Sequence, residues 1–244
     1  MNEKINRLKT ILKNSSYTVA VCGAGLMEEG GFRAVKHQDR AYDIEHRYGY
    51  GPEELFTSAC YNTRPELFFQ FYKQEMLENP PQITASGAAM AALEQKGLLH
   101  CIITSNIYDL PRRCGCQHVI NLHGDIYKNC CPRCHKEYSL DYVMNSPQIV
   151  PLCETCKVPV RPLVSLFGEM MDSQKMTETT EEITKADTLL LLGTRLDSEV
   201  YTPYLQYFNG SSLVIIHSES HYLDSRADLV IIDHPKNILP QLAK

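Results

Sequence analysis

The stretch that decides the fold is YTVAVCGAG, residues 17–25. Its apolar residues form an unbroken run, and the glycines Gly23 and Gly25 follow directly. A short apolar run without alternation is typical of a strand buried on both faces, and glycines after it allow a tight turn into a helix. The stretch therefore predicts the first strand of an α/β domain of the dinucleotide-binding type.

Similar apolar runs recur along the chain, with amphipathic segments between them. Strands are expected within residues 98–106, 118–124, 161–169, 187–196, 211–219 and 227–232, and helices within 2–14, 86–97, 176–186 and 234–244. Residues 26–80 are expected to be irregular, with short helical stretches such as 64–77. Strands that alternate with helices indicate an α/β fold with a doubly wound, parallel (Rossmann-like) sheet.

Ligands of such sheets bind at the carboxyl ends of the strands. The residues that fall at these predicted ends are mostly small or polar: Gly23, Ala24, Gly25, Ser105, Asn106, His123, Phe167, Gly168, Glu169, Gly193, Thr194, Arg195, His217, Ser218 and Glu219.

Composition narrows the class of protein. The 244 residues are 43% hydrophobic and 22% charged, with a net charge of −5. This acidic balance argues against nucleic acid or an anionic membrane as a partner. No apolar run approaches the ~20 residues of a membrane span, and residues 1–17 lack a signal core, so a cytoplasmic protein is expected.

The chain contains ten cysteines, which in a reducing compartment are better interpreted as metal ligands or buried apolar residues than as disulfides. Between residues 128 and 162, cysteines, prolines and charges replace the apolar runs. This change predicts a small zinc-binding module, residues 128–162, inserted into a nucleotide-binding domain formed by residues 1–127 and 163–244. Parts of residues 26–80 are expected to contribute to the small lobe.

Two Cys-x-x-Cys pairs lie in this module. Cys131 and Cys134 form the first pair, Cys153 and Cys156 the second, and eighteen residues separate them. This is the spacing of a zinc ribbon, in which two tight turns direct four thiolates at one ion. Because four thiolates leave no position for water, the zinc is expected to be structural. Cys130 is an alternative to Cys131 as the first ligand.

Several motifs occur together in one order: GAG at 23–25, FR at 32–33, TSNI at 104–107, HG at 123–124, the two cysteine pairs, VSLFGE at 164–169 and GTRL at 193–196. In this combination the chain resembles the sirtuin family of NAD-dependent protein-lysine deacylases, as a divergent bacterial-type member. The resemblance covers nearly the whole chain, and HG and VSLFGE are its most specific parts. It implies a deacetylase-like enzyme that uses NAD, carries structural zinc, acts on an acylated-lysine protein or peptide, and releases nicotinamide and O-acyl-ADP-ribose.

The resemblance also implies roles for residues. His123 would be the base that deprotonates a ribose hydroxyl, and the unperturbed imidazole pKa of about 6.5 suits that task. Asn106 would assist at the ribose, and a peptide strand would add to Val164, Phe167, Gly168 and Glu169. The residues implied to bind NAD are Gly23, Ala24, Gly25, Phe32, Arg33, Ser105, Asn106, Ile107, Gly193, Thr194, Arg195, His217, Ser218 and Glu219. The alternatives are a structural histidine at 123, turn or cap residues at the nucleotide positions, and an ordinary core residue at Phe167.

This chain departs from the family pattern around the nucleotide. The loop GAGLMEEGGFR is three residues shorter than the usual one, and Ser105 replaces a glutamine. Tyr108 replaces an aspartate that holds the nicotinamide amide, and Asp109 lies one position late. Glu75 stands where sirtuins that remove acidic acyl groups have an arginine, so desuccinylation is not favoured.

The departures leave two further hypotheses open. An ADP-ribosyltransferase or NAD glycohydrolase would cleave NAD with a different acceptor, and Tyr108 and Arg195 would favour it. A non-catalytic protein that binds NAD or ADP-ribose is favoured by the shortened loop. His123 and the VSLFGE motif favour the deacylase.

Overall fold

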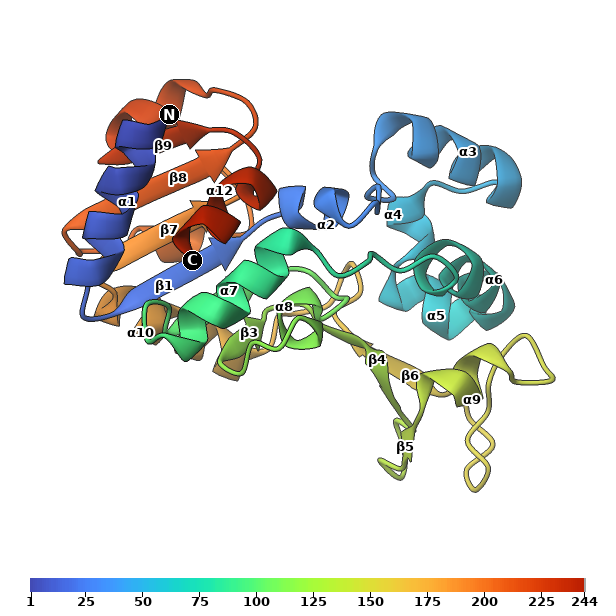
Figure 1. The fold of residues 1–244 in the computed structure, drawn as a ribbon. Helices are drawn as coiled ribbons and strands as arrows, with labels where there is room; N and C mark the ends of the chain where they lie inside the picture. The colour runs from blue at the N-terminus through green and yellow to red at the C-terminus, as the bar shows by residue number, and fades with distance from the viewer. Residues whose placement is uncertain (244) are drawn as a thin grey trace. The chain divides into compact units, whose positions relative to one another are not determined.

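The apolar run of residues 18–22 is the strand β1, which lies inside a six-stranded parallel sheet (Figure 1). The computed structural model describes residues 1–243. Along the sheet the strand order is β3-β2-β1-β7-β8-β9, the order of a doubly wound fold. The strands are β1 (Thr18–Cys22), β2 (Cys101–Thr104), β3 (Val119–Asn121), β7 (Thr188–Leu192), β8 (Ser212–His217) and β9 (Leu229–Ile232).

The central strands are buried on both faces. Val21 pairs with Ile103 on one side and with Leu191 on the other, and none of the three is accessible to solvent. In a parallel sheet the crossover connections place helices on both faces, and these helices bury the central strands. The run without alternation at residues 18–22 is therefore a consequence of its central position.

Helices from distant parts of the chain cover the sheet. One face packs through a continuous apolar core against α1 (Asn2–Asn14), α7 (Ala85–Gln95) and α12 (Pro235–Leu242). On the other side lies α10 (Ser173–Lys185) (Figure 1). The expected helices at 2–14, 86–97 and 176–186 are thus confirmed, as is the parallel sheet. The helix expected at 234–244 is confirmed as α12, and Lys244 lies outside the described residues.

The chain divides into two compact units. The first contains residues 1–31, 82–122 and 172–243, with the parallel sheet. It also contains four short helical segments: α2 (Gly25–Glu29), α8 (Leu110–Arg113), α11 (Thr202–Leu205) and the 3-10 helix η2 (Tyr222–Arg226). The domain boundaries expected from sequence stay a prediction.

The second unit, Phe32–Pro81 and His123–Met171, combines helices with a three-stranded antiparallel sheet of order β5-β4-β6. Its elements are α3 (Gln38–Tyr48), α4 (Pro52–Leu55), α5 (Ser58–Thr63), α6 (Pro65–Phe71), the π-helix η1 (Tyr72–Leu77), α9 (Leu140–Met144), β4 (Gly124–Cys130), β5 (Glu137–Tyr138) and β6 (Arg161–Val164).

Two expectations about elements were wrong in part. Residues 26–80 are largely helical rather than irregular. Their helices are short, and two of them begin with proline, so the sequence shows little helical periodicity. The strand within 161–169 does not join the parallel sheet. As β6 it pairs antiparallel with β4.

Among residues 1–243, no helix is both long and apolar enough to cross a membrane.

Candidate nucleotide site and metal centre

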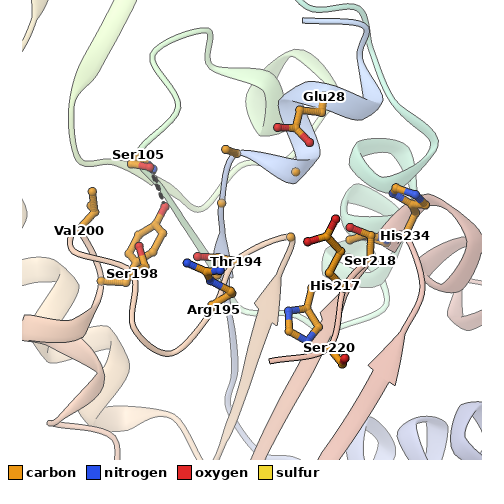
Figure 2. A pocket seen from close by; sticks show the side chains of 17 residues that line it. Glu28, Ser105, Thr194, Arg195, Ser198, Val200, His217, Ser218, Ser220 and His234 are labelled. Atoms are coloured by element: carbon orange, nitrogen blue, oxygen red, sulfur yellow. Dashed lines mark hydrogen bonds between the residues drawn. The ribbon is translucent and has the colours of Figure 1, made fainter. Parts of the chain in front are cut away.

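A cavity of about 580 Å³ lies in the first unit, where β1 and β7 run side by side (Figure 2). The chain continues in opposite directions from these two strands, to β2 and to β8, which makes this the switch point where ligands of such folds bind. The lining residues are Gly23, Ala24, Gly25, Glu28, Ser105, Gly193, Thr194, Arg195, Ser198, Val200, Tyr201, His217, Ser218, Glu219, Ser220, His234 and Pro235.

Most of the residues expected at the nucleotide therefore line one cavity. Asn106 lines a smaller neighbouring cavity that shares Gly23 with the first. Ile107 is not among the residues that line these two cavities. Phe32 and Arg33 belong to the second unit, and their expected role stays a prediction.

The glycines at the ends of β1 and β7 permit a backbone contact that no side chain allows. A Cβ atom on Gly23 would lie 2.5 Å from the carbonyl oxygen of Gly193 and 2.5 Å from the Thr194 Cβ. The Gly25 amide donates a hydrogen bond to that same oxygen at 3.2 Å, and Gly193 has a φ of +60°. Both turns are thus fixed together, and the wall of the cavity at this point is main chain.

Tyr201 is a lining residue that sequence reasoning missed. Its hydroxyl donates to the Cys22 carbonyl at 2.6 Å and accepts from the Ser105 amide at 2.8 Å. Burial raises the pKa of this phenol, so it stays protonated and can serve as donor and acceptor at once. The hydroxyl thereby connects the carboxyl ends of β1 and β2. Nothing in its sequence context marks it.

Contacts with carboxylates hold the polar side chains at the other end of the cavity. The His217 Nε2 lies 3.0 Å from Asp224, and the Arg195 Nε lies 3.2 Å from Asp197. Asp197 also approaches His221 at 3.5 Å. These contacts fix the directions of His217 and Arg195 before any ligand binds.

Sequence reasoning also missed Glu28, Ser198, Val200, Ser220, His234 and Pro235 as lining residues. His234 and Pro235 follow β9, so the strand-end rule applied to that predicted strand would have found them.

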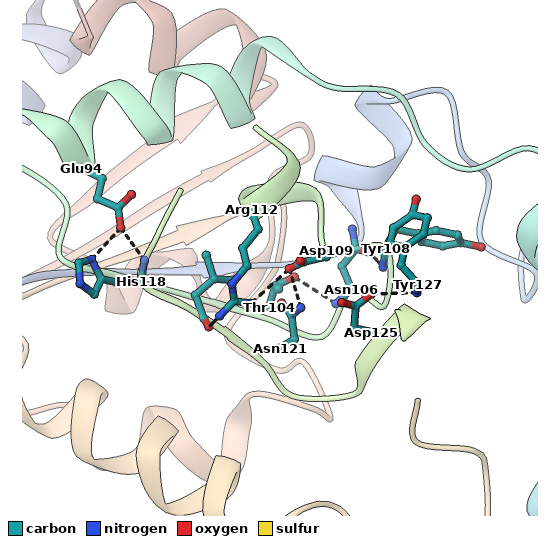
Figure 3. A network of polar contacts seen from close by, with 11 residues as sticks. Glu94, Thr104, Asn106, Tyr108, Asp109, Arg112, His118, Asn121, Asp125 and Tyr127 are labelled. Carbon is teal, nitrogen blue, oxygen red and sulfur yellow. Dashed lines mark hydrogen bonds and ion pairs between the residues drawn. The ribbon is translucent and has the colours of Figure 1, made fainter. Parts of the chain in front are cut away.

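The segment after β2 forms a polar network in the first unit (Figure 3). The Asn106 Oδ1 accepts from the Tyr108 amide at 2.6 Å, and Asp109 has a φ of 49°. The Asp109 carboxylate accepts from the Asn121 amide group at 2.7 Å and lies 3.3 Å from Arg112. Asp109 is therefore engaged with β3 and α8.

His123 and the VSLFGE segment both belong to the second unit. The Ser165 amide donates to the His123 carbonyl at 2.9 Å, which joins the two segments. Phe167 bonds through its own amide and carbonyl to Phe56 and Ser58. The residue is 40% exposed, and its ring lies beneath the Lys36 ammonium.

Glu169 and Val164 complete this segment. The Glu169 carboxylate accepts from the Leu166 amide at 2.8 Å and from Arg161 at 2.7 Å. Val164 is buried, and Gly168 has a φ of +84°. The segment is thus a tightly bonded turn with an exposed aromatic ring.

The two cysteine pairs form one cluster in the second unit. The sulfur atoms of Cys131, Cys134, Cys153 and Cys156 all lie within 4.8 Å of one another, and those of Cys134 and Cys153 are 3.8 Å apart. A zinc ion about 2.3 Å from four tetrahedral sulfurs would place them about 3.8 Å from one another. The geometry fits the ion, and Cys131, not Cys130, is the member of the cluster.

The pKa values of these thiols also favour a bound cation. A hydrogen bond from the Tyr138 hydroxyl lowers the pKa of Cys153 to about 6. Burial and the neighbouring thiols raise the pKa of Cys156 to about 12. Four adjacent thiols cannot all ionise alone, and a divalent cation removes that conflict.

A model of the Sir2 family matches residues 23–200. The chain belongs to the Sir2 family. NAD-dependent protein deacetylases of Clostridium perfringens and Clostridium acetobutylicum are 35% and 32% identical to it. The first alignment covers 98% of each chain and the second 97%. A NAD-dependent protein deacylase of Pyrococcus furiosus is 30% identical, over 98% of this chain and 97% of the relative.

Solved Sir2 structures share the whole fold of this family member. A sirtuin structure concerned with substrate affinity has a TM-score of 0.89 at 26% identity, covering 97% of this chain and 96% of the other. A Sir2 enzyme bound to a propionylated peptide has a TM-score of 0.81 at 26% identity, covering 98% and 97%. A Sir2 complex with a peptide and NAD+ has a TM-score of 0.77 at 27% identity, covering 98% and 95%.

Proposed function

We propose that this protein is an NAD-dependent protein-lysine deacylase, deacetylase-like, that releases nicotinamide and O-acyl-ADP-ribose. The observation that carries the proposal is the glycine-walled cavity at the switch point of a Sir2-family chain. Relatives along the full length are named NAD-dependent deacetylases or deacylases.

The cavity fits a dinucleotide. Its volume lies within the range of about 300–1,000 Å³ usual for small-molecule sites. A diphosphate needs close approach to main-chain amides and a nearby cation, and the glycine turns and Arg195 offer these. The residues proposed to hold NAD are Gly23, Ala24, Gly25, Phe32, Arg33, Ser105, Asn106, Ile107, Gly193, Thr194, Arg195, His217, Ser218 and Glu219. When bound, NAD supplies an electrophilic ribose carbon with nicotinamide as its leaving group.

We propose two residues for the chemistry. His123 acts as the base that takes the proton of a ribose hydroxyl, a task suited to imidazole near neutral pH. Asn106 positions the ribose through its Nδ2 group, because the Tyr108 amide already occupies its Oδ1.

The turn at Val164, Phe167, Gly168 and Glu169 is proposed to bind the acylated peptide. Hydrogen bonds to Phe56, Ser58 and Arg161 hold its backbone, which supports a preformed docking turn. Zinc in the cysteine cluster is proposed to be structural. The protein is proposed to be cytoplasmic, because clustering of four cysteines as metal ligands is a use of cysteine that suits a reducing compartment.

One assay tests the proposal. The protein is incubated with NAD and an acetyl-lysine peptide, and both peptide mass and nicotinamide are followed. Loss of the acetyl group together with O-acetyl-ADP-ribose formation is the expected result. Nicotinamide release without deacetylation would instead indicate the transferase or glycohydrolase, and binding of NAD without turnover a non-catalytic protein.

A further inference from the structure

The three-stranded sheet of the second unit carries a cavity of about 370 Å³ that the proposed chemistry does not use. It opens beside an irregularity in the pairing of β4 with β6. Asp125 of β4 pairs with Leu163 of β6, and Asn129 pairs with Pro162. The β4 chain therefore spans four residue steps where β6 spans one. Such a bulge interrupts the ladder and redirects side chains, and bulges are common beside functional sites.

Asn129 lines this cavity and is the observation that points to a ligand. The residue is only 2% exposed, and among the described residues neither its Oδ1 nor its Nδ2 has a hydrogen-bond partner. Buried amides nearly always have partners, because leaving them unpaired is unfavourable. Within residues 1–243 no hydrogen bond holds the carboxamide in place, so it can turn toward an entering group without losing one.

The chemistry of the lining indicates what enters. A carboxamide presents donor and acceptor side by side, which matches the N–H and C=O of a peptide unit. Lys128 and Glu137 are exposed lining residues of opposite charge, and neither forms an ion pair with a described residue. Leu163, 41% exposed, adds apolar surface. This mixture suits a polypeptide rather than a nucleic acid or membrane, whose charge has one sign.

We propose that this cavity is a second binding site, which holds an extended segment of the protein substrate flanking the acyl-lysine. The proposal rests on the proposed function. Leu163 lies in the cavity and directly precedes Val164, where the docking turn begins. A chain bound along β6 would therefore pass from one site to the other within the second unit.

The test compares acetylated peptides that share one short core, with and without six-residue extensions on either side. For the wild-type protein, one extension is expected to lower KM about tenfold, the effect of one or two hydrogen bonds to a buried amide. Asn129→Leu is expected to lose this gain, to turn over the short core like wild type, and to melt no lower, since it breaks no hydrogen bond among the described residues.

A second variant keeps the proposal testable should Asn129→Leu fail to fold. Leu163→Arg fills the cavity mouth and should also lose the gain, while Ile149→Arg, at a similarly exposed residue outside the cavity lining, should keep it. Equal KM values for short and extended peptides in the wild type would overturn the second site. So would Asn129→Leu with a lowered melting temperature and an unchanged gain from the extension, which would indicate a purely structural amide.

A free amide is the remaining alternative occupant. If nicotinamide inhibits Asn129→Leu much less than wild type while extended peptides bind both equally, a small amide and not a peptide occupies the cavity. If the short core itself is not deacetylated, the proposed function fails. The second site is then tested by binding alone: tighter binding of the extended peptide than of the short core supports it, and equal binding overturns it.

Discussion

At the scale of single residues, the Tyr201 hydroxyl shows how a side chain outside any motif can shape the site. It bonds both the Cys22 carbonyl and the Ser105 amide, at the ends of adjacent strands. Tyr201→Phe leaves these main-chain groups without that partner, so we expect the free energy of unfolding to fall by about 1–3 kcal/mol and NAD to bind more weakly. Denaturant titration and calorimetry measure the two effects.

The matched control is Tyr204→Phe. Tyr204 is also buried, but no hydrogen bond of its hydroxyl is found among the described residues. Equal losses in the two variants would mean that the Tyr201 hydroxyl has no special role.

His123 belongs to the same scale. We expect His123→Ala to abolish deacylation because no base remains for the ribose hydroxyl, while NAD still binds. Mass spectrometry of an acetylated peptide and a separate NAD titration check the two parts. His46→Ala, at an exposed histidine, should keep full activity. Unchanged turnover in His123→Ala would remove that residue from the mechanism.

Residue spacing predicted much of the candidate site but not its contacts. Gly23, Gly193 and His217 could be placed at strand ends because a parallel sheet brings those ends together. The hydrogen-bond partner of Asp109 could not be predicted. Its φ of 49° and its bond with Asn121 depend on how β3 and α8 pack. Tyr201 was missed for the same reason: its partners are distant in sequence.

At the scale of elements, α7 is joined to the start of β3 through Glu94. Its carboxylate accepts from the amides of Gln117 and His118 at 2.8 and 2.7 Å and contacts the His118 ring (Figure 3). Burial pushes the pKa of Glu94 up, but these hydrogen bonds outweigh it and hold the pKa below its ordinary value. The ionised carboxylate is therefore bound more favourably in the folded protein than in the unfolded chain.

The sign of the pH dependence follows. A depressed folded pKa contributes stability above the unfolded value, about 4.3, and that stability is lost as the pH falls through the folded pKa. We expect Glu94→Gln to cost about 1–3 kcal/mol at pH 7 and much less in strong acid. Urea titrations at several pH values measure this, with Glu45→Gln, at an exposed glutamate, as the control. A cost that does not change with pH would contradict the argument.

Element types in the first unit could be predicted because apolar runs and helical periodicity are strong signals there. The second unit was harder. The pairing of β6 with β4 depends on partners that the run RPLV does not reveal, since a strand sequence carries no label for its sheet.

At the scale of the whole molecule, the second unit is expected to depend on zinc. Removing the ion with a chelator, or replacing Cys131 and Cys153 by serine, should unfold the region around the cluster, because ligand loss is loss of folding energy. Zinc content and hydrogen exchange of residues 131–157 report this. Release should also become easier as the pH falls, since protons compete for the thiolates.

Cys130→Ser is the control for this experiment. Cys130 neighbours the cluster without belonging to it, so the variant should keep its zinc. Loss of zinc from Cys130→Ser, or a metal-free wild-type protein that is fully stable, would contradict the metal centre.

The strand order β3-β2-β1-β7-β8-β9 also has a consequence during synthesis. The ribosome finishes β1 at Cys22, but its neighbour β7 begins only at Thr188. At about 5–20 residues per second, that wait is on the order of ten seconds. Throughout it, one side of β1 offers bare amides and carbonyls to any passing chain. The nascent polypeptide is thus most vulnerable to aggregation before its last quarter emerges, and chaperones have most to protect at that time.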